Sequence, residues 1–204
     1  MTTPRLTASG PARDARAVVL FLHGGSETST APARRGMAYL RMVPFVRAVA
    51  SELHGRDVAT WLLRYRVRGW NGSAEDPVVD GRWALHEARR RHPGAPVVLV
   101  GHSMGGRVAL RLAGEPDVVG VCALAPWLEA GEPEPRPGAQ VLIAHGAADR
   151  VTSPAASAVY AARIGASFVP VPGETHALLR RPLFWTRLVT GFVAEALGAR
   201  SAAR

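Results

Sequence analysis

The chain has 204 residues, of which 48% are hydrophobic and 20% are charged. This length suits one hydrophobic core better than two, and the composition is typical of a globular domain rather than a disordered chain. No apolar run approaches the roughly 20 residues that cross a bilayer, and Met1–Arg16 lacks the apolar segment of a secretory signal, so we expect a cytoplasmic protein with no membrane partner.

The formal net charge is +9, and all 25 basic residues are arginine. A strongly basic chain can bind nucleic acid. The arginines are scattered, however, and their densest run, Arg89–Arg91, ends a predicted helix, where cations interact favourably with the helix dipole. We therefore expect no nucleic-acid partner. A monomer and a weak homodimer both stay open.

Short apolar runs alternate along the chain with helix-like segments. Strands are predicted at Ala17–Leu22, Val58–Leu63, Val97–Val100, Val118–Leu124, Val141–Ala144 and Ser167–Val171. Helices are predicted at Ala38–His54, Gly81–His92, Gly106–Ala113, Ala155–Ile164 and Leu183–Leu197. Most strands are continuous Val, Leu and Ile runs, as in parallel strands that are covered on both faces. The order predicts an α/β fold with a doubly wound, mostly parallel sheet of about six strands and helices on both faces.

The predicted elements form a single domain over residues 16–199, with an N-terminal extension at 1–15 and a C-terminal tail at 200–204. Proline cannot donate to a central ladder, so Pro170 indicates that the last strand lies at an edge of the sheet. The only cysteine, Cys122, lies in an apolar run, which excludes an internal disulfide and indicates a small buried side chain.

The connection between the fourth and fifth predicted strands is short. Ala125–Ala139 leaves little room for a helical lid, and its Pro- and Glu-rich part, Gly131–Gly138, is too short for a domain. We therefore expect no cap domain and an open site, walled by the loops Ser26–Gly36 and Arg66–Asp80.

The sequence Gly-His-Ser-Met-Gly at Gly101–Gly105 lies between a predicted strand and a predicted helix. A Gly-x-Ser-x-Gly pattern in this position is typical of a nucleophile elbow, a tight turn that lifts the serine hydroxyl above the sheet. Bulky side chains at 101 and 105 would collide in such a turn, which explains the two glycines. The pattern makes Ser103 the candidate nucleophile.

Three other polar features follow predicted strands. His23-Gly24-Gly25 follows the first strand, Asp149 follows the fifth and His176 follows the sixth. Reactive groups in open α/β sheets gather beyond the carboxyl ends of the strands. We therefore expect Ser103, Asp149 and His176 to converge at one edge of the sheet.

These residue types together suit nucleophilic catalysis. A serine hydroxyl needs a base to take its proton as it attacks, and histidine, with an ordinary pKa of about 6.5, is such a base. A buried carboxylate fixes the imidazole tautomer and stabilises its positive charge. The developing oxyanion needs backbone donors, which we assign to Met104 and Gly25, with Ser26 as the alternative to Gly25.

On these motifs the chain resembles the α/β-hydrolase superfamily, and within it the small, lidless serine hydrolases of the dienelactone-hydrolase and carboxylesterase types. The resemblance implies an α/β-hydrolase fold, no cofactor and an enzyme that cleaves small carboxylic esters, thioesters or lactones through an acyl-enzyme. It extends from Val18 to about Leu197. The chain departs from the family in its nearly absent cap and in its first two strands, which are missing or reduced to Pro4–Ser9.

Other residues compete for the catalytic roles. As the base, His145 and His102 are the alternatives; we interpret His145 as a packing or supporting residue and expect His102 to point away from the base. Two further carboxylates, Glu174 and Glu129, are rival acids, but neither lies one strand before the histidine loop. We expect His23 to brace the oxyanion loop by hydrogen bonds.

Ser26, Trp127 and Trp70 are the candidate substrate-binding residues. Ser26 begins a loop that is expected to wall the site, and the two tryptophans are candidates because aromatic walls are common in small-molecule pockets. No cluster has metal-ligand spacing and no glycine-rich loop fits a phosphate, so we expect no metal. Two alternatives stay open: a non-catalytic small-molecule binder on the same scaffold, and an acyltransferase or perhydrolase that uses the same residues.

Overall fold

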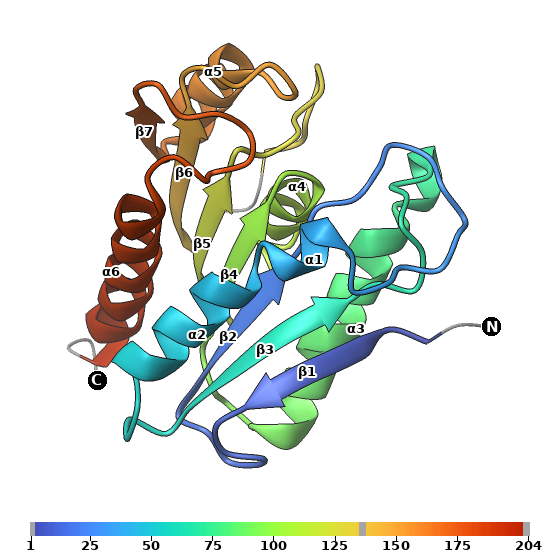
Figure 1. Cartoon of the computed structure of the whole chain (residues 1–204). Coiled ribbons are helices and arrows are strands. Elements are labelled where there is room, and N and C mark those ends of the chain that lie inside the picture. Colours follow the sequence, from blue (N-terminus) through green and yellow to red (C-terminus); the bar gives the residue numbers. More distant parts are fainter. Residues whose placement is uncertain (1–2, 135–137, 202–204) are drawn as a thin grey trace.

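A seven-stranded sheet organises the residues that the computed structural model describes, 3–134 and 138–201 (Figure 1). The strand order is β1-β3-β2-β4-β5-β6-β7, and every pair is parallel except β1 with β3. The strands are β1 (Arg5–Ser9), β2 (Ala17–Leu22), β3 (Val58–Arg64), β4 (Val97–His102), β5 (Val118–Leu124), β6 (Gln140–Gly146) and β7 (Ser167–Val171).

Helices cover both faces of the sheet (Figure 1). They are α1 (Met37–Leu40), α2 (Val43–Glu52), α3 (Asp76–Arg91), α4 (Met104–Arg111), α5 (Pro154–Ile164) and α6 (Pro182–Ser201), with a 3₁₀ turn, η1, at Gly72–Ala74. One buried cluster packs α1, α2 and α6 against the sheet, and a second packs α3, α4 and α5 against its other face. The continuous apolar strands are therefore buried on both sides, as their composition predicts.

The predicted parallel, doubly wound sheet is confirmed, with one strand more than expected. That strand, β1, lies in the segment expected to be an N-terminal extension. It pairs antiparallel with β3, and its Ser9 hydroxyl lies 2.6 Å from that of Thr60. Five mostly exposed residues carry almost no hydrophobic signal, so the apolar pattern alone does not predict this strand, but the family resemblance left open a reduced strand at Pro4–Ser9, and that alternative is confirmed.

The helix predicted over Ala38–His54 is two helices, α1 and α2. Pro44 lies in the first turn of α2. It has no N–H to continue the ladder of α1, but its fixed φ suits a helix start. At the opposite edge of the sheet, β7 contains Pro170 and is terminal, as predicted.

The loops at the carboxyl ends of the strands lie open. Between β5 and β6, residues 125–134 and 138–139 contain no helix. The two expected wall loops are joined to each other, because Ser26 bridges to Gly69 and Pro32 bridges to Val67. One wall of the site is therefore formed by two loops that are joined by backbone bridges, and no cap covers the described part of this edge.

Candidate active site

Ser103 occupies the turn between β4 and α4, with φ of +57° and ψ of −121°. Positive φ is strained for a residue with a side chain, and the surrounding packing holds it there. A Cβ at Gly101 would lie 2.1 Å from the carbonyl oxygen of Gly105, and a Cβ at Gly105 would lie 2.1 Å from that of Leu22. Only glycine fits at either position, so the local sequence forces the elbow.

His176 and Asp149 reach Ser103 from two neighbouring strand ends. The Ala148 N–H donates to the Glu174 carbonyl, at 2.9 Å, which joins the loop after β6 to the loop after β7. The Nε2 atom of His176 lies 3.1 Å from the hydroxyl oxygen of Ser103. Its Nδ1 atom lies 2.7 Å from Oδ2 of Asp149. The structure thus brings these three predicted residues into one hydrogen-bonded chain.

The Asp149 carboxylate is buried, and both of its oxygens accept hydrogen bonds. Its Oδ1 accepts the backbone N–H groups of Val151, at 2.7 Å, and Thr152, at 3.1 Å. Burial alone favours the neutral acid, but the hydrogen bonds from these N–H groups and from His176 outweigh it and lower the pKa of Asp149. The group is therefore an ionised acceptor, as the orientation of an imidazole requires.

Thr152 is a residue of this site that the sequence analysis did not single out. Its hydroxyl lies 2.9 Å from Oδ2 of Asp149 and 3.1 Å from Nδ1 of His176. His145 contacts the same oxygen: its Nε2–H donates to Asp149 at 3.1 Å, while its Nδ1 lies 2.8 Å from the Ser157 hydroxyl. His145 is completely buried, so it supports the carboxylate rather than serving as a base.

The backbone N–H groups of Gly25 and Met104 flank the serine, and neither has a hydrogen-bond partner in the described part of the chain. A Cβ on Gly25 would lie 2.4 Å from the Arg68 carbonyl oxygen and 2.5 Å from the Met104 sulfur. A Cβ on the preceding Gly24 would lie 3.4 Å from that of Ser103. The loop that carries Gly24 and Gly25 therefore lies against Ser103, and at Gly25 a side chain would not fit.

His23 is buried and holds this loop from behind. Its Nδ1–H donates to the Gly24 carbonyl at 2.6 Å, and its ring packs 4.5 Å from that of Tyr65, between centroids. Burial lowers the pKa of His23 to about 4, against the opposing effect of the Gly24 hydrogen bond. His23 is thus a neutral donor at neutral pH, in the bracing position that its sequence indicates.

The prediction that His102 points away from the base was wrong. The Nε2–H of His102 donates to the backbone carbonyl of His176 at 2.9 Å, and the two rings lie 4.8 Å apart between centroids. Burial, and to a lesser extent the nearby His176, lowers the pKa of His102 to about 3. The residue is neutral and holds the histidine loop by its backbone.

These two buried histidines predict that the protein loses stability in mild acid. Their folded-state pKa values lie below the unfolded value, so the unfolded chain takes up protons first as the pH falls through about 6.5. Above about pH 6.5 both histidines are neutral in the folded and in the unfolded protein, so they do not lower the free energy of unfolding there. Between about pH 7.5 and about pH 5, each should lower the free energy of unfolding by roughly 2 kcal/mol.

Urea denaturation at the two pH values measures this loss. The variants His23→Asn and His102→Gln keep the donated hydrogen bond but cannot titrate, so each should flatten the pH dependence by roughly 2 kcal/mol. An unchanged slope in both test variants would contradict this account.

The rival acids have other partners. The Glu174 carboxylate is buried and accepts the N–H groups of Thr175 and Arg181 and the indole N–H of Trp185, at 2.9, 3.0 and 3.0 Å. It shapes the loop that carries His176. Glu129 is paired instead with Arg107, at 2.6 Å. Neither carboxylate is hydrogen-bonded to the His176 ring in the described structure.

Arg107 lies between the rings of Trp70 and Trp127, 4.1 and 4.6 Å from their centroids. It also pairs with the buried Glu132. This cluster fixes the segment after β5 on helix α4, one turn beyond the nucleophile. Trp70 is only 4% exposed, so little of it is available to a substrate, whereas Trp127 is partly exposed and stays a candidate.

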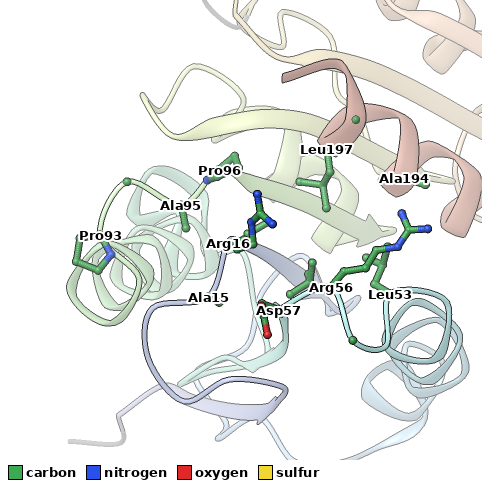
Figure 2. A pocket seen from close by; sticks show the side chains of 15 residues that line it. Ala15, Arg16, Leu53, Arg56, Asp57, Pro93, Ala95, Pro96, Ala194 and Leu197 are labelled. Carbon is green, nitrogen blue, oxygen red and sulfur yellow. The ribbon is translucent and has the colours of Figure 1, made fainter. Parts of the chain in front are cut away.

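A groove of about 760 Å³ lies at the opposite end of the sheet (Figure 2). It is lined by residues such as Arg16, Asp57 and Pro96 around the amino ends of β2, β3 and β4. None of the predicted site residues lines it. Because open α/β sheets bind ligands at the carboxyl ends of their strands, we take the cluster at Ser103, and not this groove, as the candidate active site.

Neither a metal centre nor a membrane span is found in the part of the chain described. Residues 3–134 and 138–201 contain no group of three or more His, Cys, Asp or Glu side chains placed to hold a metal ion. Among the same residues, every helix falls short of the length and hydropathy needed to traverse a bilayer.

Comparison with known proteins gives one family and a set of structural neighbours. The model of the family described as serine aminopeptidase, S33, matches residues 13–142, well over half of the chain. Curated protein sequences give no match.

Three solved structures illustrate the neighbours. A protein of unknown function from Agrobacterium tumefaciens is 17% identical, with 96% of this chain and 91% of that one covered and a TM-score of 0.73. Est1E from Butyrivibrio proteoclasticus is 15% identical, with 97% and 96% covered and a TM-score of 0.70. An α/β serine hydrolase without a lid, from Xanthomonas campestris, is 20% identical, with 94% and 88% covered and a TM-score of 0.69. At these identities the likeness shows a common fold.

Proposed function

Because the chain belongs to the family described as serine aminopeptidase, S33, within the α/β-hydrolase superfamily, we propose that this hydrolase cleaves small carboxylic esters, thioesters or lactones. The observation that carries the proposal is the unbroken chain of hydrogen bonds from the Ser103 hydroxyl through His176 to Asp149. It starts at a residue held in a strained backbone conformation. A passive pocket needs neither the relay nor the strain.

In the first half of the reaction, the Ser103 hydroxyl attacks the ester carbonyl while Nε2 of His176 takes its proton. The Asp149 carboxylate holds the other ring nitrogen and stabilises the imidazolium. The negative charge on the former carbonyl oxygen is stabilised by the N–H groups of Met104 and Gly25. The tetrahedral intermediate then collapses: the ester C–O bond breaks, and the leaving alcohol takes the proton from His176.

In the second half, a water molecule attacks the acyl group on Ser103 and gives its proton to His176. The same N–H groups hold the second oxyanion, and collapse releases the acid and returns the proton to Ser103. The absence of a helix in the described residues between β5 and β6 supports an open site that water enters without the movement of a cap.

An ester suits the site better than the peptide substrate that the family description suggests. An aminopeptidase must bind the free α-ammonium group of its substrate, which requires a carboxylate with capacity to spare. Around the serine, Asp149 and Glu174 are saturated by donors, and Glu129 is paired with Arg107. The loops near the site add arginines, among them Arg150 and Arg181. These cations oppose an ammonium group, and the carboxylate left to bind one is the exposed Glu27 on the loop after Gly25, which forms no ion pair among the described residues.

Labelling and turnover together test the proposal. A fluorophosphonate should modify the protein once, on the peptide that contains Ser103, because only an activated serine reacts. The protein should hydrolyse p-nitrophenyl acetate or butyrate and leave aminoacyl p-nitroanilides intact. Turnover of the anilides alone would replace the ester proposal by an aminopeptidase. A protein that neither reacts with the label nor turns over any ester, thioester or lactone would be a binder.

A further inference from the structure

The exposed apolar side chains of this protein are concentrated beside the candidate active site. Of the eight large apolar residues exposed in the described residues, five lie in two short segments near it. They are Met37 and Leu40, which are 72% and 48% exposed, and Leu179, Leu183 and Phe184, at 68%, 71% and 38%. We name these five the apolar rim. A sixth, Val151, follows Asp149 by two residues.

The two segments flank the site on one side of the sheet. Met37 and Leu40 belong to α1, which follows the oxyanion loop, and the others lie between His176 and the first turn of α6. Helices α1 and α6 lie on the same face of the sheet (Figure 1). Both contribute to the buried cluster that contains Tyr39 and Leu178. Isolated apolar residues on a surface are ordinary, but a gathering of them marks an interaction site.

In the two stretches of chain that contain these segments, arginines are present and acidic residues are not. Residues 28–51 contain four arginines and no Asp or Glu, and residues 175–194 contain three arginines and no Asp or Glu. The guanidinium groups of Arg34, Arg35 and Arg181 are on exposed residues, and none of them forms an ion pair within the described structure. Elsewhere the arginines are often neutralised, as Arg89 is by Asp117, at 2.5 Å.

We propose that the apolar rim and its arginines dock the mouth of the site on an anionic lipid surface. Apolar side chains that enter the region between headgroups and acyl chains, with cations beside them for acidic headgroups, are what binding at a lipid interface requires. A neutral small-molecule ester would explain neither the unpaired arginines nor the exposure of Leu179 and Leu183. This proposal departs from the expectation of no membrane partner, which rested on the lack of a membrane-crossing segment, because peripheral binding needs no such segment.

Docking in this way would bring the Ser103 hydroxyl close to the interface. The substrate would then be an amphiphilic ester taken from the lipid layer. This consequence for the substrate rests on the hydrolase proposed above, whereas the docking does not. The binding experiment therefore uses the full chain with Ser103→Ala, which binds lipid if the docking is right, whatever its chemistry.

Co-sedimentation compares vesicles of phosphatidylcholine alone with vesicles of phosphatidylcholine and phosphatidylglycerol. We expect binding to the anionic vesicles only, weakened by salt because the arginine contribution is screened. Arg35→Gln with Arg181→Gln should lower the affinity by roughly 25-fold, since each cation near an anionic surface contributes about fivefold. Met37→Ser with Leu183→Ser should also lower it, and thermal unfolding checks that each variant is folded.

Matched controls lie far from the site. Arg16→Gln with Arg56→Gln removes the same charge at the groove on the opposite end of the sheet (Figure 2), and Val159→Ser removes an exposed apolar side chain from α5. Both should bind as the parent does. Equal binding to neutral and anionic vesicles, an equal loss in the controls, or rim variants that change only the oligomeric state would each overturn the proposal.

Discussion

Replacing Ser103 with alanine is expected to lower kcat/KM for a short p-nitrophenyl ester by roughly 10⁴- to 10⁶-fold. The substitution removes the oxygen that forms the acyl-enzyme and leaves only the backbone donors and substrate binding, which by themselves give about 10³- to 10⁴-fold over the uncatalysed reaction. The N–H groups of Gly25 and Met104 do not depend on the hydroxyl, so the residual rate is not zero. Steady-state assays of purified protein, with labelling by a fluorophosphonate, measure the loss.

The control for this variant is Ser167→Ala, at the start of the edge strand β7, where the residue is exposed. It should keep the parental rate and labelling. Urea denaturation of Ser103→Ala should show a folded protein, since among residues 3–134 and 138–201 the hydroxyl is hydrogen-bonded to His176 alone. If the folded variant hydrolysed the ester at the parental rate, another residue would be the nucleophile.

The positions of the site residues could be expected from the sequence because a parallel sheet leaves few choices. Glycines at 101 and 105 mark a turn too tight for any side chain, and each of the other polar motifs follows an apolar run that can only be a buried strand. The structure brings Ser103, Asp149 and His176 together at that edge. Their catalytic roles stay a prediction, which the variants test.

The supporting contacts could not be predicted, because they depend on side-chain geometry across loops. Thr152 has the sequence signature of a residue before a helix, yet its hydroxyl bonds to Asp149. His102 is a variable position of the elbow motif, and only the path of the histidine loop brings the His176 carbonyl to it. The stacking of Arg107 between Trp70 and Trp127 joins three segments that no local pattern connects.

Replacing Asp149 with asparagine is expected to lower kcat by about 10⁴-fold while the substrate still binds. The reason is the tautomer of His176. Backbone N–H groups of Val151 and Thr152 both point at Oδ1, so the amide oxygen of asparagine will take that position. The amide NH₂ then faces Nδ1 of His176, which must become an acceptor. Its proton moves to Nε2, which faces Ser103 and can no longer act as a base.

The matched control is Asp57→Asn, the same change at an exposed residue with φ of +55°, a conformation that asparagine tolerates. It should leave kcat unchanged. Because Asp149 also accepts from Thr152 and His145, denaturation must show that Asp149→Asn is folded at the assay temperature. A tautomer error lowers kcat with little change in KM, whereas a collapsed site changes both. If the folded variant retained its parental kcat, Asp149 would not orient His176, and another group would have to fix the imidazole.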